Sequence, residues 1–360
     1  MQSRGPERGA LPAALVMRHP RDMVVALVAM LLSLAIGGCS VHSVPIAKDS
    51  EAQLREHAIS GEKLGFQLLP GGKRYRLALF RAQLPEHPVE IPMDRSVAGL
   101  PTIRMSLNHL KPVRFIADTG AQLSVVESDI AINARAEVYA PKDGTLRVEG
   151  IGGEERAWLA RFASARLGPI EFADLVTVLR REASALRFGG LRVGGFDVNL
   201  LGAPVISAFS FVTFDYRAKR MMFSGFTPFA PSRGAVRVPM EMRDSLPYVP
   251  VQINGRTFQA LVDTGARDQL FLNKQIVAEL GLEGAAKAGG TFKAAGLGGM
   301  IRGRTFHLPV IYVGAMPVPD VSVDSSGGPW RVRIGSELLE RWRTTFDFRN
   351  HALWLEMPAL

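Results

Sequence analysis

The stretch Ala117–Ala121 is ADTGA, and the stretch Val262–Ala266 is VDTGA. Each copy of Asp-Thr-Gly-Ala follows an apolar run. A single Asp-Thr-Gly after a strand is more often a turn than a catalytic group, because Gly relaxes the backbone and Asp favours turns. Two copies, placed alike in two halves of one chain, require a common explanation.

The sequence around the two copies repeats as well. Pro92-Met93 and Pro239-Met240 precede them, and Asn108 and Asn254 stand 10 and 9 residues before the respective Asp. The segment before the second copy predicts a hairpin, since apolar residues alternate up to Ile253 and Asn254-Gly255 favours a tight turn. We expect the return strand to run directly into Asp-Thr-Gly.

Later elements recur in the same order after each copy. The first half contains the tip Glu149–Gly153, then Leu200-Leu201-Gly202, then a Phe-Asp-Tyr-Arg turn; the second contains Ala295–Gly299, Arg333-Ile334-Gly335 and Phe-Asp-Phe-Arg. Gly-rich tips between strand-like segments indicate hairpins. The chain is therefore predicted to be all-β, with a first lobe at 88–228 and a second lobe at 229–360.

Two similar lobes that pack about a pseudo-twofold axis bring equivalent loops together at that axis. Asp118 and Asp263 would then face each other. Two carboxylates about 3 Å apart share one proton, which gives an acid and a base without histidine or metal. We therefore expect a water-mediated amide hydrolysis without a covalent intermediate, and no cofactor or metal.

These motifs resemble the retropepsin-like aspartic proteases, in particular bacterial proteins with two such domains fused in one chain. The resemblance covers about residues 90–355 and implies two closed-barrel lobes with a central cleft. It implies that Asp118 and Asp263 form the catalytic pair. Thr119 and Thr264 would brace the two loops, and Gly120 and Gly265 would offer their amides to the carboxylates.

The resemblance assigns roles to further residues. Gly150, Ile151 and Gly152 would form one flap over the substrate, and Gly296, Leu297 and Gly298 the other. Leu201-Gly202 and Ile334-Gly335 would support the Asp-Thr-Gly loops. Ala121 and Ala266 carry no hydroxyl to donate to the carboxylates, so we expect raised pKa values and activity toward neutral pH.

Two arginines depart from the family pattern. Arg267 follows the second Asp-Thr-Gly-Ala and precedes Asp268, so it is either a surface ion pair or a cation beside the catalytic pair. Arg333 occupies an apolar position of the element before Gly335. If a cation lies near the aspartates, it favours their ionised form and opposes the effect of the alanines.

The N-terminal region predicts export. Arg18 and Arg21 precede an apolar run, residues 23–37, and small residues lead to Cys39, as in a signal peptide at 1–38; Met17 is an alternative first residue. The run Ile36-Gly37-Gly38-Cys39 resembles a bacterial lipobox, which implies lipidation of Cys39; the alternative is an ordinary signal peptide. Residues 39–87 are then expected to form the lipidated N-terminus, a linker and one added segment, Arg74–Gln83.

The composition bears on which kinds of partner the protein binds. The formal net charge is +9, without basic runs interleaved with aromatic residues, so a basic solvated surface is favoured over nucleic-acid binding. We expect a monomer with pseudo-twofold lobes, anchored by lipid to the envelope, facing the periplasm and more readily at the outer membrane. The alternatives are a non-catalytic lipoprotein that binds peptides or envelope components, and association through the lobes without cleavage.

Overall fold

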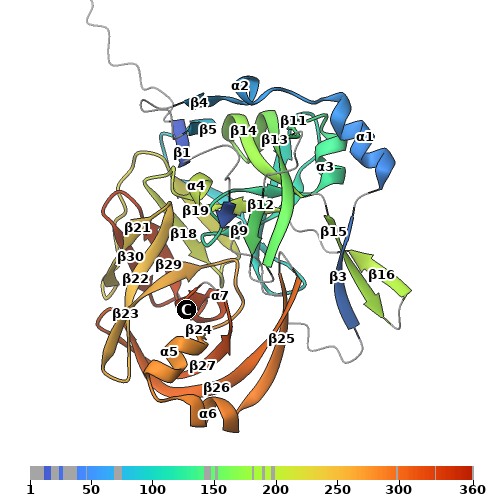
Figure 1. Ribbon diagram of the computed structural model, residues 1–360. Coiled ribbons are helices and arrows are strands. Elements are labelled where there is room, and N and C mark those ends of the chain that lie inside the picture. Colours follow the sequence, from blue (N-terminus) through green and yellow to red (C-terminus); the bar gives the residue numbers. More distant parts are fainter. Residues whose placement is uncertain are drawn as a thin grey trace, which may run out of the picture.

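The computed structural model describes residues 12–17, 24–26, 39–45, 47–68, 75–141, 147–150, 153–180, 182–188, 191–195, 199–296, 299–328 and 330–358. Strands dominate these residues, and they form two lobes, the first above the second in Figure 1. The prediction of an all-β, two-lobed protein is confirmed.

The two lobes share most of their elements in the same order. The first lobe consists of β6 (Val89–Pro92), β7 (Asp94–Arg95), β8 (Pro101–Leu107), β9 (Val113–Asp118), β10 (Val125–Val126), α3 (Ser128–Asn133), β11 (Glu137–Tyr139), β12 (Arg147–Gly150), β13 (Gly153–Leu167), β14 (Ile170–Arg180), β15 (Glu182–Phe188), β16 (Leu191–Gly195), β17 (Leu200–Gly202), α4 (Ala203–Ile206), β18 (Phe211–Asp215) and β19 (Arg220–Ser224). The second lobe consists of β20 (Val236–Pro239), β21 (Glu241–Arg243), β22 (Leu246–Ile253), β23 (Arg256–Asp263), β24 (Leu270–Asn273), α5 (Lys274–Glu279), α6 (Glu283–Ala288), β25 (Gly290–Gly296), β26 (Gly299–Val313), β27 (Met316–Ser326), β28 (Val332–Gly335), α7 (Ser336–Leu339), β29 (Arg343–Asp347) and β30 (Ala352–Glu356). Strand β11 and the hairpin β15–β16 are added in the first lobe, and α6 is added in the second.

Strand pairing repeats between the lobes. In the first, β17 lies parallel to β9 with Gly202 opposite Asp118; in the second, β28 lies parallel to β23 with Gly335 opposite Asp263. The hairpin β22–β23 turns at Asn254-Gly255, and both residues have positive φ, at 47° and 79°. Asn and Gly tolerate this left-handed conformation, which explains why the turn was predictable from the sequence.

One sheet joins the two lobes. Its six strands run in the order β20-β30-β29-β18-β19-β6, three from each lobe. At its centre β18 and β29 pair antiparallel, so that Thr213 lies opposite Thr345 and their hydroxyl oxygens are 2.8 Å apart. Phe214 and Phe346, both buried, meet edge to face beside them, 5.6 Å between ring centres. Backbone hydrogen bonds and aromatic packing therefore couple the halves.

The segment expected to be a linker is largely structured. It contains β3 (Cys39–Pro45), α1 (Lys48–Glu56), α2 (Gly61–Leu64), β4 (Phe66–Leu68) and β5 (Tyr75–Gln83). The Arg55 guanidinium lies 4.8 Å from the ring centre of Trp158, and Ile59 N–H donates to Val138 O at 2.8 Å. Strand β5, close to the predicted Arg74–Gln83, joins β14. The residues expected to link the anchor to the lobes therefore pack on the first lobe.

Residues of the predicted signal peptide pair with the added segment and with the first lobe. Strand β1 (Pro12–Met17) lies antiparallel to β5, and β2 (Val24–Ala26) lies parallel to β12. Removal of residues 1–38 would leave β5 and β12 without these neighbours. Among the described residues, no helix is long and apolar enough to cross a membrane.

Two local features depend on neighbouring strands. Leu272 and Asn273 continue β24, and helix α5 begins at Lys274, where Asn273 Oδ1 accepts Ile276 N–H at 2.9 Å. The Gly-rich stretch from Leu186 belongs to the hairpin β15–β16, which pairs with β3 in the sheet at the right of Figure 1.

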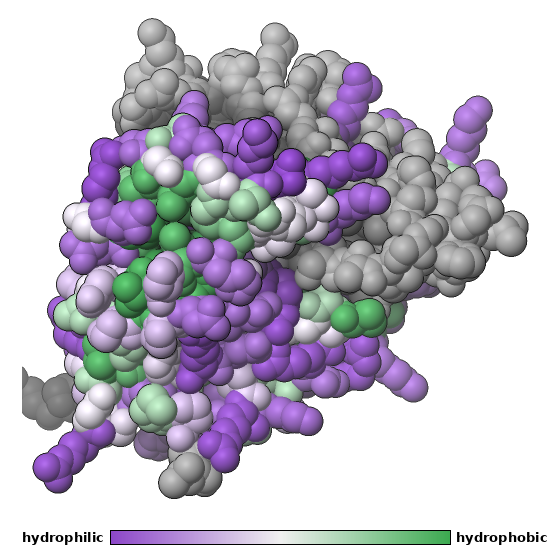
Figure 2. Space-filling view, turned by 90° about the horizontal axis from the view of Figure 1, so that it is seen from below, coloured by the Kyte–Doolittle hydropathy of each residue, from purple (hydrophilic) through white to green (hydrophobic). Residues whose placement is uncertain are grey.

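The core extends through both lobes as one large cluster of buried apolar side chains. The face turned toward the viewer in Figure 2 is largely hydrophilic, with apolar side chains gathered on its left half. Val310 and Tyr312 on β26 are among the exposed apolar residues, each 39% exposed. A surface that mixes exposed apolar and polar side chains is ordinary for a folded protein.

Candidate active site

The two Asp-Thr-Gly loops meet between the lobes. Asp118 ends β9 and Asp263 ends β23, and both are 0% exposed. A Cβ atom on Gly120 would lie 2.4 Å from Cγ of Asp263, and one on Gly265 would lie 2.2 Å from Cγ of Asp118. Each loop therefore packs its glycine directly against the carboxylate of the other, an approach that no larger residue permits.

Reciprocal hydrogen bonds join the loops through their threonines. Thr119 N–H donates to Thr264 Oγ1, and Thr264 N–H donates to Thr119 Oγ1, each at 3.0 Å. The hydroxyls then cross to the opposite strand: Thr119 Oγ1 donates to Val262 O at 2.7 Å, and Thr264 Oγ1 donates to Ala117 O at 2.6 Å. The pattern is close to twofold symmetric and fixes both carboxylates relative to each other.

Each carboxylate also accepts a hydrogen bond from a backbone N–H of its own loop. Gly120 N–H donates to Asp118 Oδ1 at 2.8 Å, and Gly265 N–H donates to Asp263 Oδ1 at 2.9 Å. The Oδ2 atoms of both aspartates are buried and accept no hydrogen bond from the described residues. Ala121 and Ala266, which follow the glycines, are fully buried and have no hydroxyl to offer.

The elements that follow Gly202 and Gly335 hold the loops from behind. Ala203 N–H donates to Ala121 O at 2.8 Å. Ser336 donates to Ala266 O from both its N–H and its hydroxyl, each at 2.7 Å. Strands β17 and β28, which carry Leu201 and Ile334, thus lie where the sequence placed them, directly beside the aspartate strands.

The two Gly-rich segments lie at the ends of long hairpins. Gly150 lies opposite Gly153 at the end of β12–β13, and Gly296 lies opposite Gly299 at the end of β25–β26. The predicted tip residues Ile151, Gly152, Leu297 and Gly298 lie outside the described residues. Below the second tip, Ala294 of β25 packs against Ala266, and Phe292 and Ile301 border this contact. The hairpin β25–β26 therefore covers the second loop.

The cation beside the aspartates is Arg333, not Arg267. Arg333 Nη1 lies 3.5 Å from Asp263 Oδ2, and its Nη2 donates to Asp268 Oδ1 at 3.0 Å; all three side chains are at most 1% exposed. Arg267 turns away and binds Glu340, with Nη1 3.0 Å from Oε1. The interpretation of Arg267 and Asp268 as a local pair is wrong, because Asp268 is the partner of Arg333. In the sequence, the sign of this buried cation was the presence of Arg333 at an apolar strand position.

Burial raises the pKa values of the two carboxyls. The pKa of Asp118 lies well above its usual value because the side chain is desolvated and faces Asp263. Desolvation raises the pKa of Asp263 to about 6, although the Arg333 guanidinium lowers it. Two facing carboxyls with raised pKa values favour a shared proton, the state that acid–base hydrolysis by two carboxyls requires.

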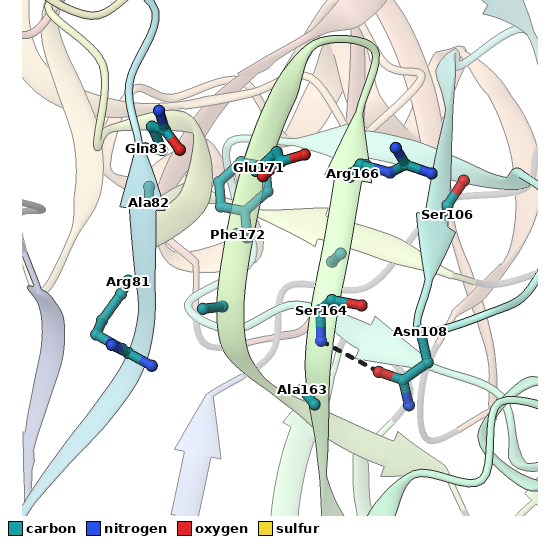
Figure 3. Close-up of a pocket in the computed structure, with 12 residues that line it drawn as sticks. Arg81, Ala82, Gln83, Ser106, Asn108, Ala163, Ser164, Arg166, Glu171 and Phe172 are labelled. Carbon is teal, nitrogen blue, oxygen red and sulfur yellow. Dashed lines mark hydrogen bonds between the residues drawn. The ribbon is translucent and has the colours of Figure 1, made fainter.

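A separate hollow of about 450 Å³ lies on the first lobe (Figure 3). Strands β5, β8, β13 and β14 contribute its walls, and Ser164 N–H donates to Asn108 Oδ1 across it at 3.2 Å. Its lining includes Arg81, Arg166 and Glu171, and no residue of the two loops. In the described part of the chain, no cluster of His, Cys, Asp and Glu could hold a metal ion.

Two family models match the chain, one in each lobe. The aspartyl protease model matches residues 103–205, and the model of the putative aspartyl protease of gag polyproteins matches residues 249–341. Each match contains one Asp-Thr-Gly loop. The chain therefore carries two aspartyl protease domains, one in each lobe, as the repeated sequence implied.

Solved structures similar to this aspartyl protease include a retropepsin-like aspartic protease from Rickettsia conorii. That match has 20% identity and a TM-score of 0.27, and it covers 34% of this chain and 90% of the other. Basic 7S globulin from soybean matches with 12% identity and a TM-score of 0.42, covering 76% of this chain and 95% of the globulin. No curated protein matches the chain.

Proposed function

We propose that this aspartyl protease is an endopeptidase whose catalytic residues are Asp118 and Asp263. The observation that carries the proposal is the pair of buried carboxylates, each packed against the glycine of the opposite loop. Thr119, Gly120, Ala121, Thr264, Gly265 and Ala266 hold the pair in place. The predicted flap residues, Gly150, Ile151 and Gly152 in the first lobe and Gly296, Leu297 and Gly298 in the second, close over a bound peptide and exclude bulk solvent from it.

The chemistry follows from one shared proton. The ionised carboxylate takes a proton from a water molecule, and the water oxygen attacks the carbonyl carbon of the peptide bond. The protonated carboxyl gives its proton to the carbonyl oxygen, so that a neutral tetrahedral intermediate forms. When the C–N bond breaks, the amine takes the proton that the first carboxyl gained, and the hydroxyl returns one to the second.

A diverse peptide library tests this function. We expect cleavage at internal peptide bonds between about pH 4 and 7.5, blocked by a statine-type inhibitor, whose hydroxyl imitates the tetrahedral intermediate. Folded protein that binds library peptides but cleaves none would contradict the endopeptidase and favour the alternative, a peptide-binding protein that retains the fold.

We further propose that the protein is tethered to the cell envelope through a lipid on Cys39 and faces the periplasm, at the outer membrane rather than the inner one. The apolar run before Cys39 and the lipobox-like Ile36–Cys39 support this. Under this proposal the mature protein lacks residues 1–38, and its anchor sits at the first residue of β3, next to β15.

Mass spectrometry of the N-terminal peptide and membrane fractionation test the anchor. We expect a lipidated Cys39 and a protein that moves to the soluble fraction when Cys39→Ser is introduced. A mature protein cleaved elsewhere, or one that fractionates unchanged in the variant, would contradict the anchor and leave the endopeptidase proposal intact.

A further inference from the structure

The two lobes differ at a buried position beside their catalytic loops. In the first lobe Leu200 lies opposite Ile116, two residues before Asp118; in the second Arg333 lies opposite Leu261, two residues before Asp263. The fifth residue after each aspartate is also apolar in the first lobe and charged in the second: it is Leu123 in one and Asp268 in the other. An ion pair in the second lobe thus replaces two buried leucines of the first.

The guanidinium of Arg333 is held firmly. Its Nη2 donates to Asp268 Oδ1 at 3.0 Å, and its Cζ lies 5.0 Å from the ring centre of Phe271. This leaves Nη1 facing Asp263 Oδ2 at 3.5 Å. Neither Nη1 nor that oxygen has a hydrogen-bond partner among the described residues. The positive charge is therefore fixed beside one carboxylate, where dissolved salt screens it much less than a charge at the surface.

Four other ionisable groups act on Asp263, Arg333, Asp268 or one another. They are Asp118 of β9, across the lobe boundary, Tyr248 of β22, Asp324 of β27 and Glu337 of α7. Each of them becomes negative when it ionises, so its ionisation opposes a negative charge on Asp263. Arg333 is the cation in this group, and Asp268 beside it is its direct counter-ion.

We propose that Arg333, held by Asp268, is a positioning residue that makes Asp263 the ionised member of the pair and leaves Asp118 to carry the shared proton. The inference rests on the proposed endopeptidase function and assigns its two roles. Asp263 takes the proton of the attacking water and later passes it to the leaving amine. Asp118 protonates the carbonyl oxygen and regains a proton when the intermediate collapses.

The residues of the first lobe suggest a matched variant of the second. Arg333→Leu alone would leave the buried Asp268 without its counter-ion, and an unpaired buried charge destabilises proteins strongly. The double variant Arg333→Leu/Asp268→Leu instead gives the second lobe the residues of the first. Of the two charges, Arg333 acts more strongly on Asp263 than Asp268 does, so their joint removal disfavours the ionised carboxylate.

The readout is the pH dependence of kcat/KM on a peptide that the parent cleaves. In the double variant we expect the acid limb of the profile to move up by about 1 pH unit, as for loss of a neighbouring opposite charge. Arg267→Leu, which removes the arginine bound to Glu340, is expected to leave the limb in place. Arg333→Lys, which keeps the charge, is expected to restore most of the parent profile.

A merely structural role for Arg333 predicts lower kcat/KM at every pH with an unmoved limb, and that result overturns the inference. If the parent cleaves no peptide, the proposed function fails instead. The inference is then tested by carboxyl ¹³C NMR titration of aspartate-labelled protein, assigned with Asp118→Asn and Asp263→Asn. The Asp263 signal must titrate at higher pH in the double variant; an unchanged titration refutes the inference.

Discussion

At the scale of single residues, the reciprocal threonine bonds explain how two carboxylates with raised pKa values stay close together. Repulsion between them would separate two loose loops. The Thr264 hydroxyl accepts a hydrogen bond from Thr119 N–H and donates one to Ala117 O. The Thr119 hydroxyl accepts from Thr264 N–H and donates to Val262 O. Because these groups are fully buried, a lost hydroxyl leaves donors and acceptors unpaired.

Thr264→Val tests this brace. The valine has a similar shape but no hydroxyl, so we expect the free energy of unfolding to fall by about 2–3 kcal/mol, with a loss of cleavage of at least about tenfold. Thr264→Ser keeps the hydroxyl and is the control. Chemical denaturation of both variants checks the prediction, and a valine variant as stable as the parent would contradict it.

Ala121 and Ala266 determine how acidic the pair is. In the double variant Ala121→Ser/Ala266→Ser, hydroxyl donors become available to the carboxylates and stabilise their ionised form. The pKa of Asp263, about 6 in the parent, should fall, and the acid limb of the pH–activity profile should move to lower pH. Profiles of kcat/KM measure this directly; a limb that stays or moves upward argues against the role given to the alanines.

The sequence predicted that the aspartates, threonines and glycines of the two loops meet, because the motif is duplicated and each residue type has one evident use. It did not predict which arginine approaches the pair. Arg267 is adjacent to the motif in sequence, whereas Arg333 reaches it only because β28 lies parallel to β23. Contacts of this kind depend on tertiary pairing, which no local pattern encodes.

At the scale of elements, the six-stranded sheet between the lobes determines whether the halves unfold together. Phe346 of β29 is fully buried and packs on Phe214 of β18. Phe346→Ala is expected to lower the free energy of unfolding by about 3–5 kcal/mol. Because the sheet is shared, calorimetry should still show one transition at a lower temperature.

Val310→Ala, on the exposed face of β26, is the control and should change stability by less than about 0.5 kcal/mol. Two separate transitions in the Phe346 variant, with one lobe melting as in the parent, would show that the sheet does not couple the lobes.

Prediction of elements succeeded where the signal is local. The Asn254-Gly255 turn and the strand into Asp263 need no distant partner. Local signals do not reveal the hairpin β15–β16, whose Gly-rich sequence is typical of a loop and whose third strand, β3, begins at Cys39. Nor do they reveal α1 and α2, short helices that are stabilised by packing on the first lobe rather than by their own sequence.

At the scale of the whole molecule, the raised carboxyl pKa values link stability to pH. Desolvation, with Asp268 nearby, raises the pKa of Asp324 on β27 from 3.8 to about 7. The folded state therefore binds this proton more tightly than the unfolded state. Its contribution to stability is present at low pH and is lost as the pH rises from about 4 to about 7.

Asp324→Asn removes this dependence because an amide does not ionise. Relative to the parent, the variant should gain about 4 kcal/mol of stability between pH 4 and pH 8, because the pKa of Asp324 differs by about 3 units between the folded and unfolded states. Urea unfolding at the two pH values checks the gain. An equal difference between variant and parent at both values would contradict it.

The most direct test of the account is the cleavage activity of Asp118→Asn and Asp263→Asn, measured separately on a peptide that the parent cleaves. Asparagine keeps the shape of each side chain but removes the shared proton. We predict that each variant loses at least about a thousandfold in kcat/KM while remaining folded, with an unfolding midpoint at neutral pH no lower than that of the parent. Substantial cleavage by either variant would show that the two aspartates do not act as one catalytic pair.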